Sequence, residues 1–429
     1  MSLLKTSALN GIAVGVRIVV ALFINKILAV YVGPSGYAIV GQFQNVLAMV
    51  AAFATGSTGN GIVKLTAEYG ENQQRQRRLW QTAATIVCAT TLIGGFIIFL
   101  LRQRLAVIFL YDSGYSSIFA WVAICLPLIA FNALLLAIMN GRKEIRRYII
   151  SNIVGSIISL VLTGLLAWRF GLYGALTALT LSQGVVLFVT LQQATKTTWF
   201  QSKFIFGRID TLELRKLSGF VIMALTTAIV SPLSQIFVRS ALTDQFGLQY
   251  AGYWDAMWRI SSLYLLLVTS SLSLYYLPRI AEIKNWPEMR IELIHVYSIV
   301  IPFVIGASFA IFLCRDIIVS VLFSSDFFPM RTLFPWQLIG DVVKIASWLL
   351  AFLMVGRGMI GSFVVTEIIA GIVFWLATIY ATRVYGFEGV AIAHFITYMV
   401  YFCLVAALTI ATPKQRAAMF VQEQVQRRS

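Results

Sequence analysis

Twelve apolar runs, each long enough to form a membrane-spanning helix, follow one another along this chain of 429 residues. They fall at residues 8–31, 36–66, 80–101, 117–139, 148–168, 174–195, 217–242, 250–277, 293–314, 332–354, 360–382 and 388–411. About 20 apolar residues cross the hydrocarbon core of a bilayer, where a helix satisfies its own backbone hydrogen bonds without water. The pattern predicts an all-α integral membrane protein of about twelve transmembrane helices.

Composition excludes a water-soluble protein. Charged residues make up 12% of the chain, hydrophobic residues 59%, and the mean hydropathy is +0.85. Soluble domains carry about 25% charged residues, because polar groups must cover their surface. The first apolar run passes Tyr31 without a small-residue cleavage site, so we expect a span there and not a signal peptide. The four cysteines have neither metal-site nor disulfide spacing, and we predict no metal or cofactor.

Positive charge is spread unevenly over the loops. The net charge of +16 lies in short loops and not on one basic face, which argues against a nucleic-acid partner. Of the Lys and Arg residues, 21 fall in one set of alternate loops and seven, Arg239 among them, in the other. The positive-inside rule then places both termini in the cytoplasm, with an even number of spans. The longest loop, 196–216, is too short for an extramembrane domain.

The chain reads as a duplication, because short segments of its two halves match at offsets of 213 to 216 residues. The matched segments include Phe99–Arg102 with Phe312–Arg315, Met139–Arg142 with Met354–Arg357, and Gly171–Gly174 with Gly386–Gly389. Six spans per repeat give both halves the same orientation, as in transporters built from parallel repeats. We therefore predict two six-helix lobes, 1–195 and 217–411, joined by a cytoplasmic linker at 196–216 and followed by a basic tail at 412–429. A duplication without bearing on mechanism is the alternative.

Charged residues inside the spans are candidate functional residues, because a charge at bilayer depth costs several kcal/mol unless it faces protein or water. The cations are Arg17, Lys26, Lys64, Arg259 and Lys344, and the acids are Asp255, Asp341 and Glu367. Arg17 lies near mid-span, whereas Lys26 is on the opposite helix face and can snorkel toward the interface. An excess of cations over acids favours an anionic substrate, with phosphate groups as the obvious class.

Two of these acids have a cation at pairing distance on the same helix. Asp255 and Arg259 are spaced i, i+4, and Asp341 and Lys344 are spaced i, i+3. An internal salt bridge therefore competes with a role in substrate binding or gating for each pair. His394 has no partner in sequence, and a packing role is favoured over a proton relay.

Several stretches resemble bacterial polysaccharide-lipid flippases, and the resemblance runs from the first span to about residue 411. The stretches that carry it are Lys26–Val30, Gly33–Gly36, Asn60–Lys64, Gly252–Ser261, Tyr276–Arg279 and Trp336–Lys344. The chain is similar to the O-antigen translocase and lipid III flippase branch of the multidrug/oligosaccharidyl-lipid/polysaccharide exporter superfamily. Members with fourteen spans, such as peptidoglycan-precursor flippases, fit less well because twelve spans are predicted here.

The resemblance implies two six-helix lobes around a V-shaped cavity, working by alternating access. It implies that an undecaprenyl-pyrophosphate-linked oligosaccharide, of the O-antigen or enterobacterial common antigen type, moves from the cytoplasmic to the periplasmic leaflet of the inner membrane in lipopolysaccharide or related polysaccharide biosynthesis. Membrane lipid and other polysaccharide-assembly membrane proteins are the implied further partners. The residues that match the family, with Arg17 where a basic residue is expected, form the predicted substrate-binding set: Arg17, Lys26, Lys64, Asp255, Arg259, Asp341 and Lys344.

Other functions stay open at this point. A drug or cation antiporter of the same superfamily would share the fold, but it needs acidic residues to dominate its cavity. A membrane polymerase or ligase of polysaccharide assembly needs a large external loop with convergent acid and base groups. An ion channel needs a selectivity filter, and no such segment is present in the sequence. The sequence indicates neither the sugar repeat unit nor the ion that drives the cycle.

Overall fold

The computed structural model is helical throughout and describes residues 3–55, 59–70, 72–200, 207, 209–283 and 285–410. The chain divides into two compact units between residues 232 and 233. The predicted basic tail, 412–429, and a part of the predicted linker, 201–206, lie outside the described residues.

Unit 1 contains long helices that are interrupted by glycines. Its elements are α1 (Leu3–Ala54), α2 (Gly59–Glu68), α3 (Gln73–Leu110), a 3-10 turn (Ser113–Tyr115), α4 (Ser116–Gly141) and α5 (Ile145–Thr195). α1 is broken at Gly33, where φ is 69°, and α5 at Gly171, where φ is 55°. A left-handed φ is open to glycine at little cost, so each break turns the chain without a loop. Each of these long helices therefore supplies two of the predicted spans.

Unit 2 follows the same scheme with shorter helices. α6 (Thr211–Phe246) begins in unit 1 and ends in unit 2. The remaining elements are α7 (Leu248–Ser271), a π-helical turn (Leu272–Tyr276), α8 (Leu277–Glu282), α9 (Trp286–Leu313), α10 (Arg315–Leu322), a 3-10 segment (Ser325–Leu333), α11 (Phe334–Gly356), α12 (Ile360–Tyr385), a 3-10 turn (Gly386–Glu388) and α13 (Gly389–Thr409).

The described helices account for the predicted spans. Among the described residues, eight helical segments are long and apolar enough to cross a membrane. Three of them, Gly11–Ala54, Ile145–Thr195 and Ile360–Thr409, each hold two helices. α7 holds the remaining predicted span, and its charged residues Asp255 and Arg259 lower its mean hydropathy. The predicted class, an all-helical membrane protein, is confirmed.

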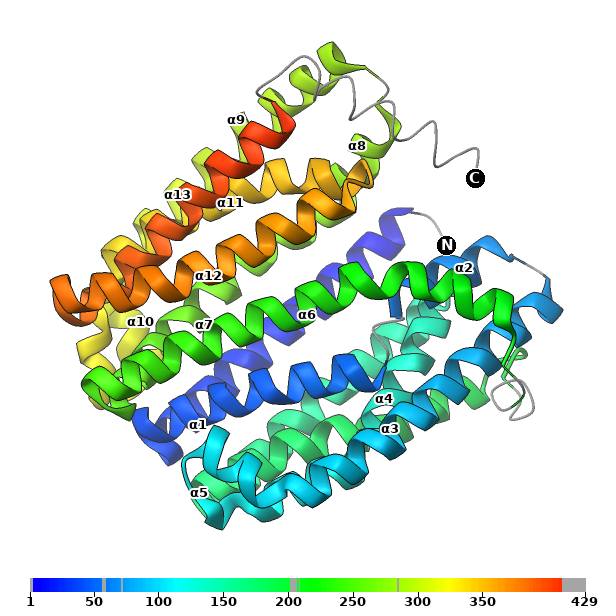
Figure 1. The fold of residues 1–429 in the computed structure, drawn as a ribbon, viewed down its shortest axis with the longest axis horizontal. Coiled ribbons are helices and arrows are strands. Elements are labelled where there is room, and N and C mark those ends of the chain that lie inside the picture. Colours follow the sequence, from blue (N-terminus) through cyan, green and yellow to red (C-terminus); the bar gives the residue numbers. More distant parts are fainter. Residues whose placement is uncertain are drawn as a thin grey trace. The chain divides into compact units, whose positions relative to one another are not determined.

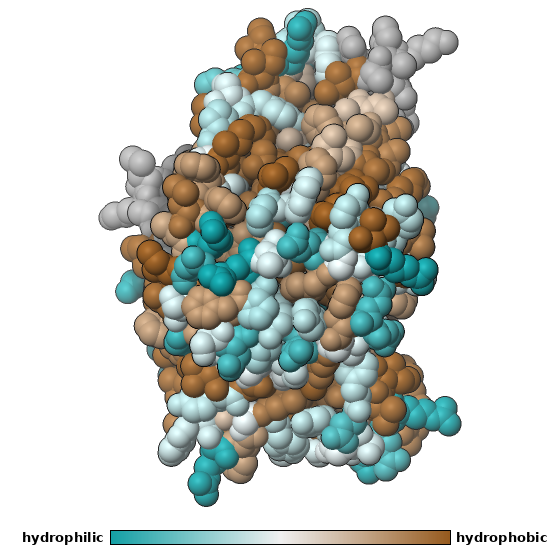
Figure 2. Space-filling view, turned by 90° about the vertical axis from the view of Figure 1, so that its left-hand side faces the viewer, coloured by the Kyte–Doolittle hydropathy of each residue, from teal (hydrophilic) through white to brown (hydrophobic). Residues whose placement is uncertain are grey.

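Apolar side chains cover much of the surface of the helices. On α3 alone, Leu92, Ile93, Phe96 and Leu100 are each more than 60% exposed. Figure 2 shows large brown areas of hydrophobic surface beside the polar ones. Soluble monomers do not expose apolar area on this scale, so these flanks are built for lipid contact.

In unit 1, α1 packs on α5, and α4 packs between α3 and α5 (Figure 1). The backbones of α3 and α4 come close at Gly95, where an added Cβ would lie 3.0 Å from the carbonyl oxygen of Ala123. Small residues allow this close approach. Inside lipid the hydrophobic effect does not drive helices together, so the van der Waals contacts of such close packing hold them instead.

In unit 2, α13 packs between α11 and α12, and α9 lies along α11 (Figure 1). The core contains Tyr276, Leu349, Met354 and Tyr401, all buried. A close contact between α11 and α13 occurs at Gly340, where an added Cβ would lie 3.2 Å from the Cα of Phe395.

Backbone features recur in both units at the spacing of the sequence repeat. The left-handed residues pair as Gly33 with Gly247, Lys143 with Gly358, and Gly171 with Gly386, at offsets of 214, 215 and 215. Gly174 and Gly389, also 215 apart, each pack so closely on the preceding helix that a Cβ would collide with a backbone carbonyl. Each half of the chain thus turns at equivalent positions.

The described part of the predicted linker 196–216 packs against unit 1. The rings of Trp199 and Trp80 are 5.3 Å apart in edge-to-face contact. The backbone N–H of Asp210 donates to the hydroxyl of Thr82 at 2.9 Å. The division between the units falls within α6 at Pro232, a residue that removes one helical hydrogen bond. The lobe boundaries at 195 and 217 stay a prediction.

Candidate functional site: charged residues within the helices

The two predicted cations of α1, Arg17 and Lys26, differ in exposure. Arg17 lies in the first helix of α1, midway between its start at Leu3 and the break at Gly33, and its side chain is exposed. Within the described part of the chain, its guanidinium forms no ion pair or hydrogen bond. Lys26, further along the same helix, is half-buried. An exposed arginine midway along a spanning helix must face water or a ligand.

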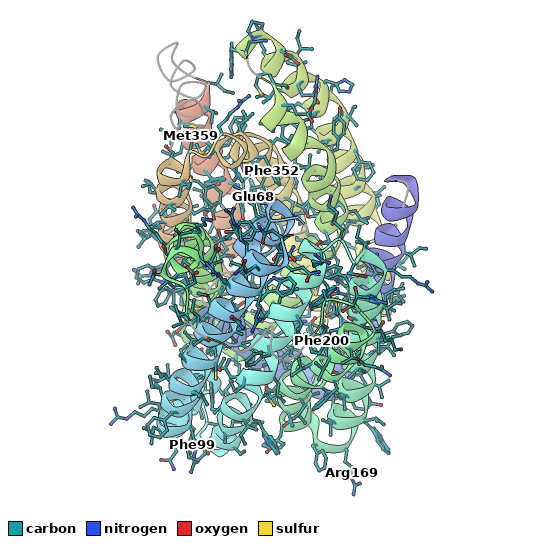
Figure 3. All side chains as sticks on the ribbon, turned by 90° about the vertical axis from the view of Figure 1, so that its right-hand side faces the viewer. Glu68, Phe99, Arg169, Phe200, Phe352 and Met359 are labelled. Carbon is teal, nitrogen blue, oxygen red and sulfur yellow. The ribbon has the colours of Figure 1, made fainter. Side chains whose placement is uncertain are left out.

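Lys64 lies on α2, which is separate from α1, so the predicted single run 36–66 is divided between two helices. Ile62 and Leu65 are buried on one face of α2. Lys64 and Glu68 are exposed, and Glu68 is labelled in Figure 3. The two charges therefore lie on the exposed face of α2, and their i, i+4 spacing places them on one face.

In unit 2, the carboxylate of Asp255 is bound by Arg239. The Nε of Arg239 donates to Oδ2 of Asp255 at 3.0 Å, and its Nη2 donates to Oδ1 at 2.5 Å. The Arg239 side chain is 1% exposed and lies 5.6 Å from the ring centre of Trp254. The predicted pairing of Asp255 with Arg259 is therefore corrected, and so is the placement of Arg239 in a loop.

The turn at Gly247 explains why Arg239 meets Asp255. Arg239 lies eight residues before Gly247 on α6, and Asp255 lies eight residues after it on α7. With a φ of 97°, Gly247 folds α7 back along α6, and residues equally distant from such a turn come side by side. A bidentate, buried arginine–carboxylate pair is strong and geometrically specific.

Asp341 is at the centre of a buried hydrogen-bond network. Its Oδ1 lies 3.0 Å from Nε2 of His394, and its Oδ2 accepts from the hydroxyl of Tyr264 at 2.9 Å. The same hydroxyl lies 3.3 Å from Oγ of Ser308. The four residues come from α11, α13, α7 and α9, and both Asp341 and His394 are fully buried. A buried carboxylate is tolerated only when it is bound in this way.

Lys344, one turn after Asp341, is surrounded by aromatic rings. Its Nζ lies 4.7 Å from the ring centre of Trp258, 5.0 Å from that of Trp348 and 5.2 Å from that of Tyr398. Its side chain is 6% exposed. The electron-rich ring faces stabilise an ammonium by cation–π attraction. Asp341, predicted as its partner, instead binds His394 and Tyr264.

Glu367 and His394 had no partner in sequence, and both have one in the structure. Oε1 of Glu367 on α12 accepts from the hydroxyl of Tyr401 on α13 at 2.7 Å. The sequence did not identify Tyr264, Tyr398 or Tyr401, because aromatic residues make up 13% of the chain and none stands out. Arg239 did carry a signal, since it fell within the predicted span 217–242.

Two loop arginines act as braces at repeat-related positions. Nη1 of Arg142 donates to Oε1 of Gln76 at 3.0 Å and to the carbonyl oxygen of Gly70 at 3.5 Å. Arg357, 215 residues later and 2% exposed, donates to the carbonyl oxygen of Ile283. Both arginines bind carbonyl oxygens of the backbone and contribute to the fold, so a cation in a loop is not by itself a candidate for substrate contact.

Five of the seven predicted substrate-binding residues thus fall into two classes, and the other two, Lys26 and Arg259, are half-buried. In unit 2, Asp255, Asp341 and Lys344 are buried and bound within the unit. In unit 1, Arg17 and Lys64 are exposed. Among the described residues, no cluster of three His, Cys, Asp or Glu side chains has the arrangement of a metal site. Binding and movement of an anionic molecule are what these groups can support chemically.

Comparison with known proteins identifies the fold and the family. A family described as polysaccharide biosynthesis protein matches residues 3–284. The chain is 29% identical over 405 residues to the lipid III flippase of Escherichia coli strain K12, covering 94% of this chain and 97% of that protein. It is equally similar to the lipid III flippase of Shigella flexneri.

Solved structures of transporters have the same fold. An inward-facing multidrug resistance MATE transporter of the MOP superfamily superposes with a TM-score of 0.75, at 16% identity and 95% coverage of both chains. The lipid II flippase MurJ, in an inward closed conformation, gives a TM-score of 0.70 at 12% identity, over 97% of this chain and 90% of that one. The outward-facing form of the MATE transporter gives 0.64 at 15% identity and 96% coverage of both.

These findings confirm the predicted resemblance and the predicted class of transporter rather than enzyme. The relatives are a flippase and transporters, and they match along nearly the whole chain. The helical arrangement is that of the MOP superfamily. This chain is a multi-pass membrane protein that belongs to the polysaccharide biosynthesis protein family.

Proposed function

We propose that the chain is a flippase that moves a polyprenyl-pyrophosphate-linked oligosaccharide, an O-antigen or enterobacterial common antigen repeat unit, from the cytoplasmic to the periplasmic leaflet of a bacterial inner membrane. The family and the end-to-end match to a lipid III flippase support this proposal.

The observation that carries the proposal is the exposed guanidinium of Arg17 on a spanning helix, for which the described residues supply no partner. Holding a charge at that depth without a protein partner is costly, and it is offset when an anion binds there. A pyrophosphate offers an arginine bidentate, charge-assisted hydrogen bonds. We propose Lys26, Lys64 and Arg259 as further contacts of the pyrophosphate during transport.

The predicted substrate contacts of Asp255, Asp341 and Lys344 stay a prediction. In the described conformation these three side chains are bonded within unit 2. We propose that they position the helices of unit 2, and that any contact with substrate requires one of these bonds to open.

Alternating access of the two repeats is the proposed mechanism, in which lobe 1–195 moves against lobe 217–411 around a V-shaped cavity. Solved relatives of the same fold include inward-facing and outward-facing conformations, which supports two states for this architecture. Because the described part of 196–216 packs on unit 1, we propose α6 near Pro232 as the place where the chain bends.

A drug or cation antiporter is the second candidate, and the high TM-score to a multidrug transporter favours it. Such a protein needs acidic side chains accessible from its cavity to attract cations. Asp255 and Asp341 are 4% and 0% exposed, and each is already bound to protein groups. The exposed Arg17 would repel a cationic drug, which favours the flippase.

The test compares Arg17→Ala with Arg17→Lys in a strain that lacks its own flippase, with surface glycan as the readout. We expect Arg17→Ala to reduce surface glycan by tenfold or more and Arg17→Lys to retain part of it, since one charge-assisted bond contributes about 1.5–3 kcal/mol. Arg169→Ala is the matched control, because that exposed arginine projects away from the helices of unit 1 (Figure 3). Full glycan from Arg17→Ala at normal protein level would refute the assignment.

A further inference from the structure

An apolar groove runs between α9 and α11 in unit 2. Its volume is about 470 Å³, and its lining includes Ile305 and Phe309 from α9 and Leu338, Ile339 and Val342 from α11. Ile305, Phe309 and Ile339 are each about half exposed or more, so the groove opens at the surface of the unit. An exposed apolar groove of this kind on a membrane protein fits a hydrocarbon chain.

The groove continues into a second cavity that carries positive charge. This cavity, about 610 Å³, shares Phe312 and Pro335 with the groove and is also lined by Arg315 and Arg331. The guanidinium of Arg315 stacks on the ring of Phe312 at 4.5 Å. The two cavities together therefore join an apolar channel to a pair of arginines.

The charge balance of the second cavity favours an anion. Nη1 of Arg331 pairs with Oδ1 of Asp316 at 3.0 Å, which neutralises one of the two arginines. Nη1 of Arg315 donates to the carbonyl oxygen of Phe312 at 2.9 Å, and its charge has no acidic partner among the described residues. One net positive charge next to an apolar groove is complementary to a phosphate group on a lipid.

The length of the groove fits a chain within one leaflet. Ile305 and Phe312 are seven residues apart on α9, which corresponds to a rise of about 10 Å. One leaflet contributes about half of the ~30 Å hydrocarbon core. The arginines lie past the end of α9, on the side that the charge pattern of the loops predicts to be periplasmic.

The corresponding helix contact in unit 1, between α3 and α4, is closed and therefore serves as an internal control. Gly95 on α3 corresponds to Ser308 on α9 at an offset of 213, and there α3 closes against α4, with an added Cβ 3.0 Å from the carbonyl oxygen of Ala123. Arg102 nevertheless stacks on Phe99 at 4.5 Å, as Arg315 stacks on Phe312. Unit 1 has the stacked arginine but a closed helix contact.

We propose that the groove and its arginines bind one anionic phospholipid of the periplasmic leaflet, with an acyl chain between α9 and α11 and the phosphate at Arg315 and Arg331. Ser308 lines the groove and also lies at hydrogen-bond distance from Tyr264, which donates to Asp341. The bound chain is thus one side chain away from the buried network of unit 2.

The test measures lipid retention by native mass spectrometry on the full-length protein in detergent, titrated with dioleoyl-phosphatidylglycerol or dioleoyl-phosphatidylcholine. We expect the wild type to retain one phosphatidylglycerol about tenfold more tightly than phosphatidylcholine, because both carry a phosphate but the choline cation neutralises it and is repelled by Arg315. Arg315→Gln with Arg331→Gln should abolish the preference. Ile339→Trp, which fills the groove, should reduce retention of both lipids.

Two control variants leave the site intact. Arg102→Gln removes the stacked arginine of unit 1, and Ile299→Trp adds bulk to α9 outside the groove; both should retain phosphatidylglycerol like the wild type. Equal retention by the wild type and by the double arginine variant would overturn the proposal. Tighter retention of undecaprenyl phosphate than of phosphatidylglycerol, lost in the same variants, would overturn it too and assign the groove to a polyprenyl lipid.

Discussion

Five of the predicted site residues differ in exposure between the two units. In unit 1, Arg17 and Lys64 are exposed on their helices, and Arg17 has no partner within the described residues. In unit 2, Asp255, Asp341 and Lys344 are buried, and each is bound by side chains of neighbouring helices. Although the halves share their turns, a charge in one half cannot be given the role of a charge in the other. An exposed charge midway along a spanning helix indicates access to water or a ligand, whereas a satisfied buried charge indicates a structural role.

The largest expected effect on stability comes from breaking the Arg239–Asp255 pair. Arg239→Met leaves a buried carboxylate without its cation, and we expect a loss of about 3–5 kcal/mol in the free energy of unfolding. Combining it with Asp255→Leu should restore most of the lost stability, because no buried charge then lacks a partner. Thermal unfolding of the purified full-length protein measures both. Equal losses for the single and the double variant would contradict a structural role for the pair.

A smaller effect is expected at Tyr264, whose hydroxyl donates to Asp341. Tyr264→Phe keeps the ring and leaves one oxygen of a buried carboxylate unsatisfied, which costs about 1–3 kcal/mol. Tyr275→Phe is the control, because Tyr275 is 59% exposed in the same unit. A loss at Tyr264 no greater than that at Tyr275 would show that the network does not stabilise unit 2.

A substitution at Lys344 distinguishes a structural role from a role in transport for one buried charge of unit 2. Lys344→Met removes a cation–π interaction of about 0.5–2 kcal/mol, but it also removes the cost of burying a charge, so we expect a net change within about 1 kcal/mol. The variant should fold, and surface glycan then reports on transport alone. Normal glycan export would show that the predicted substrate contact of Lys344 is wrong, and lost export would give unit 2 a charge with the role assigned to Arg17.

The smallest effect on stability is expected for Arg17→Ala. An exposed side chain without a partner contributes within about 0.5 kcal/mol to unfolding, so this variant should be as stable as the wild type while export falls. A clear loss of stability would mean that Arg17 has a structural role, and the contrast between the two units would then disappear.

Much of the fold was predictable from periodicity and length. The apolar runs predicted the spans, and the gaps between the runs contain the turns that the structure shows at Gly171 and Gly386. Hydropathy could not show that the helices on either side of Gly33 and Gly171 are joined without a loop, because both sides are equally apolar. The separation of α2 from α1 did carry a signal, because the run 36–66 contains the polar, glycine-rich stretch 55–61, which the predicted span passed over.

The candidate site was less predictable, because pairing across helices depends on how they pack. A spacing of i, i+4 predicted Arg259 as the partner of Asp255, but the turn at Gly247 brings Arg239 from another helix. Counting residues outward from that glycine would have found the pair. Of the rings around Lys344, only Trp348 follows from a count, since it lies four residues later on α11, whereas Trp258 and Tyr398 come from α7 and α13.

Lys143 occupies a left-handed position, with φ of 60°, where the repeat-related residue is Gly358, with φ of 66°. For a residue with a Cβ, this conformation destabilises the folded state by about 1–2 kcal/mol. A glycine avoids that strain but loses more chain entropy on folding, which offsets about 0.5–1 kcal/mol of the gain. The side chain of Lys143 is exposed, so Lys143→Gly should raise the melting temperature slightly. Lys143→Gly is therefore a stabilising substitution for purification, cryo-microscopy or crystallisation, and the second half of the chain already has glycine at the equivalent position, Gly358.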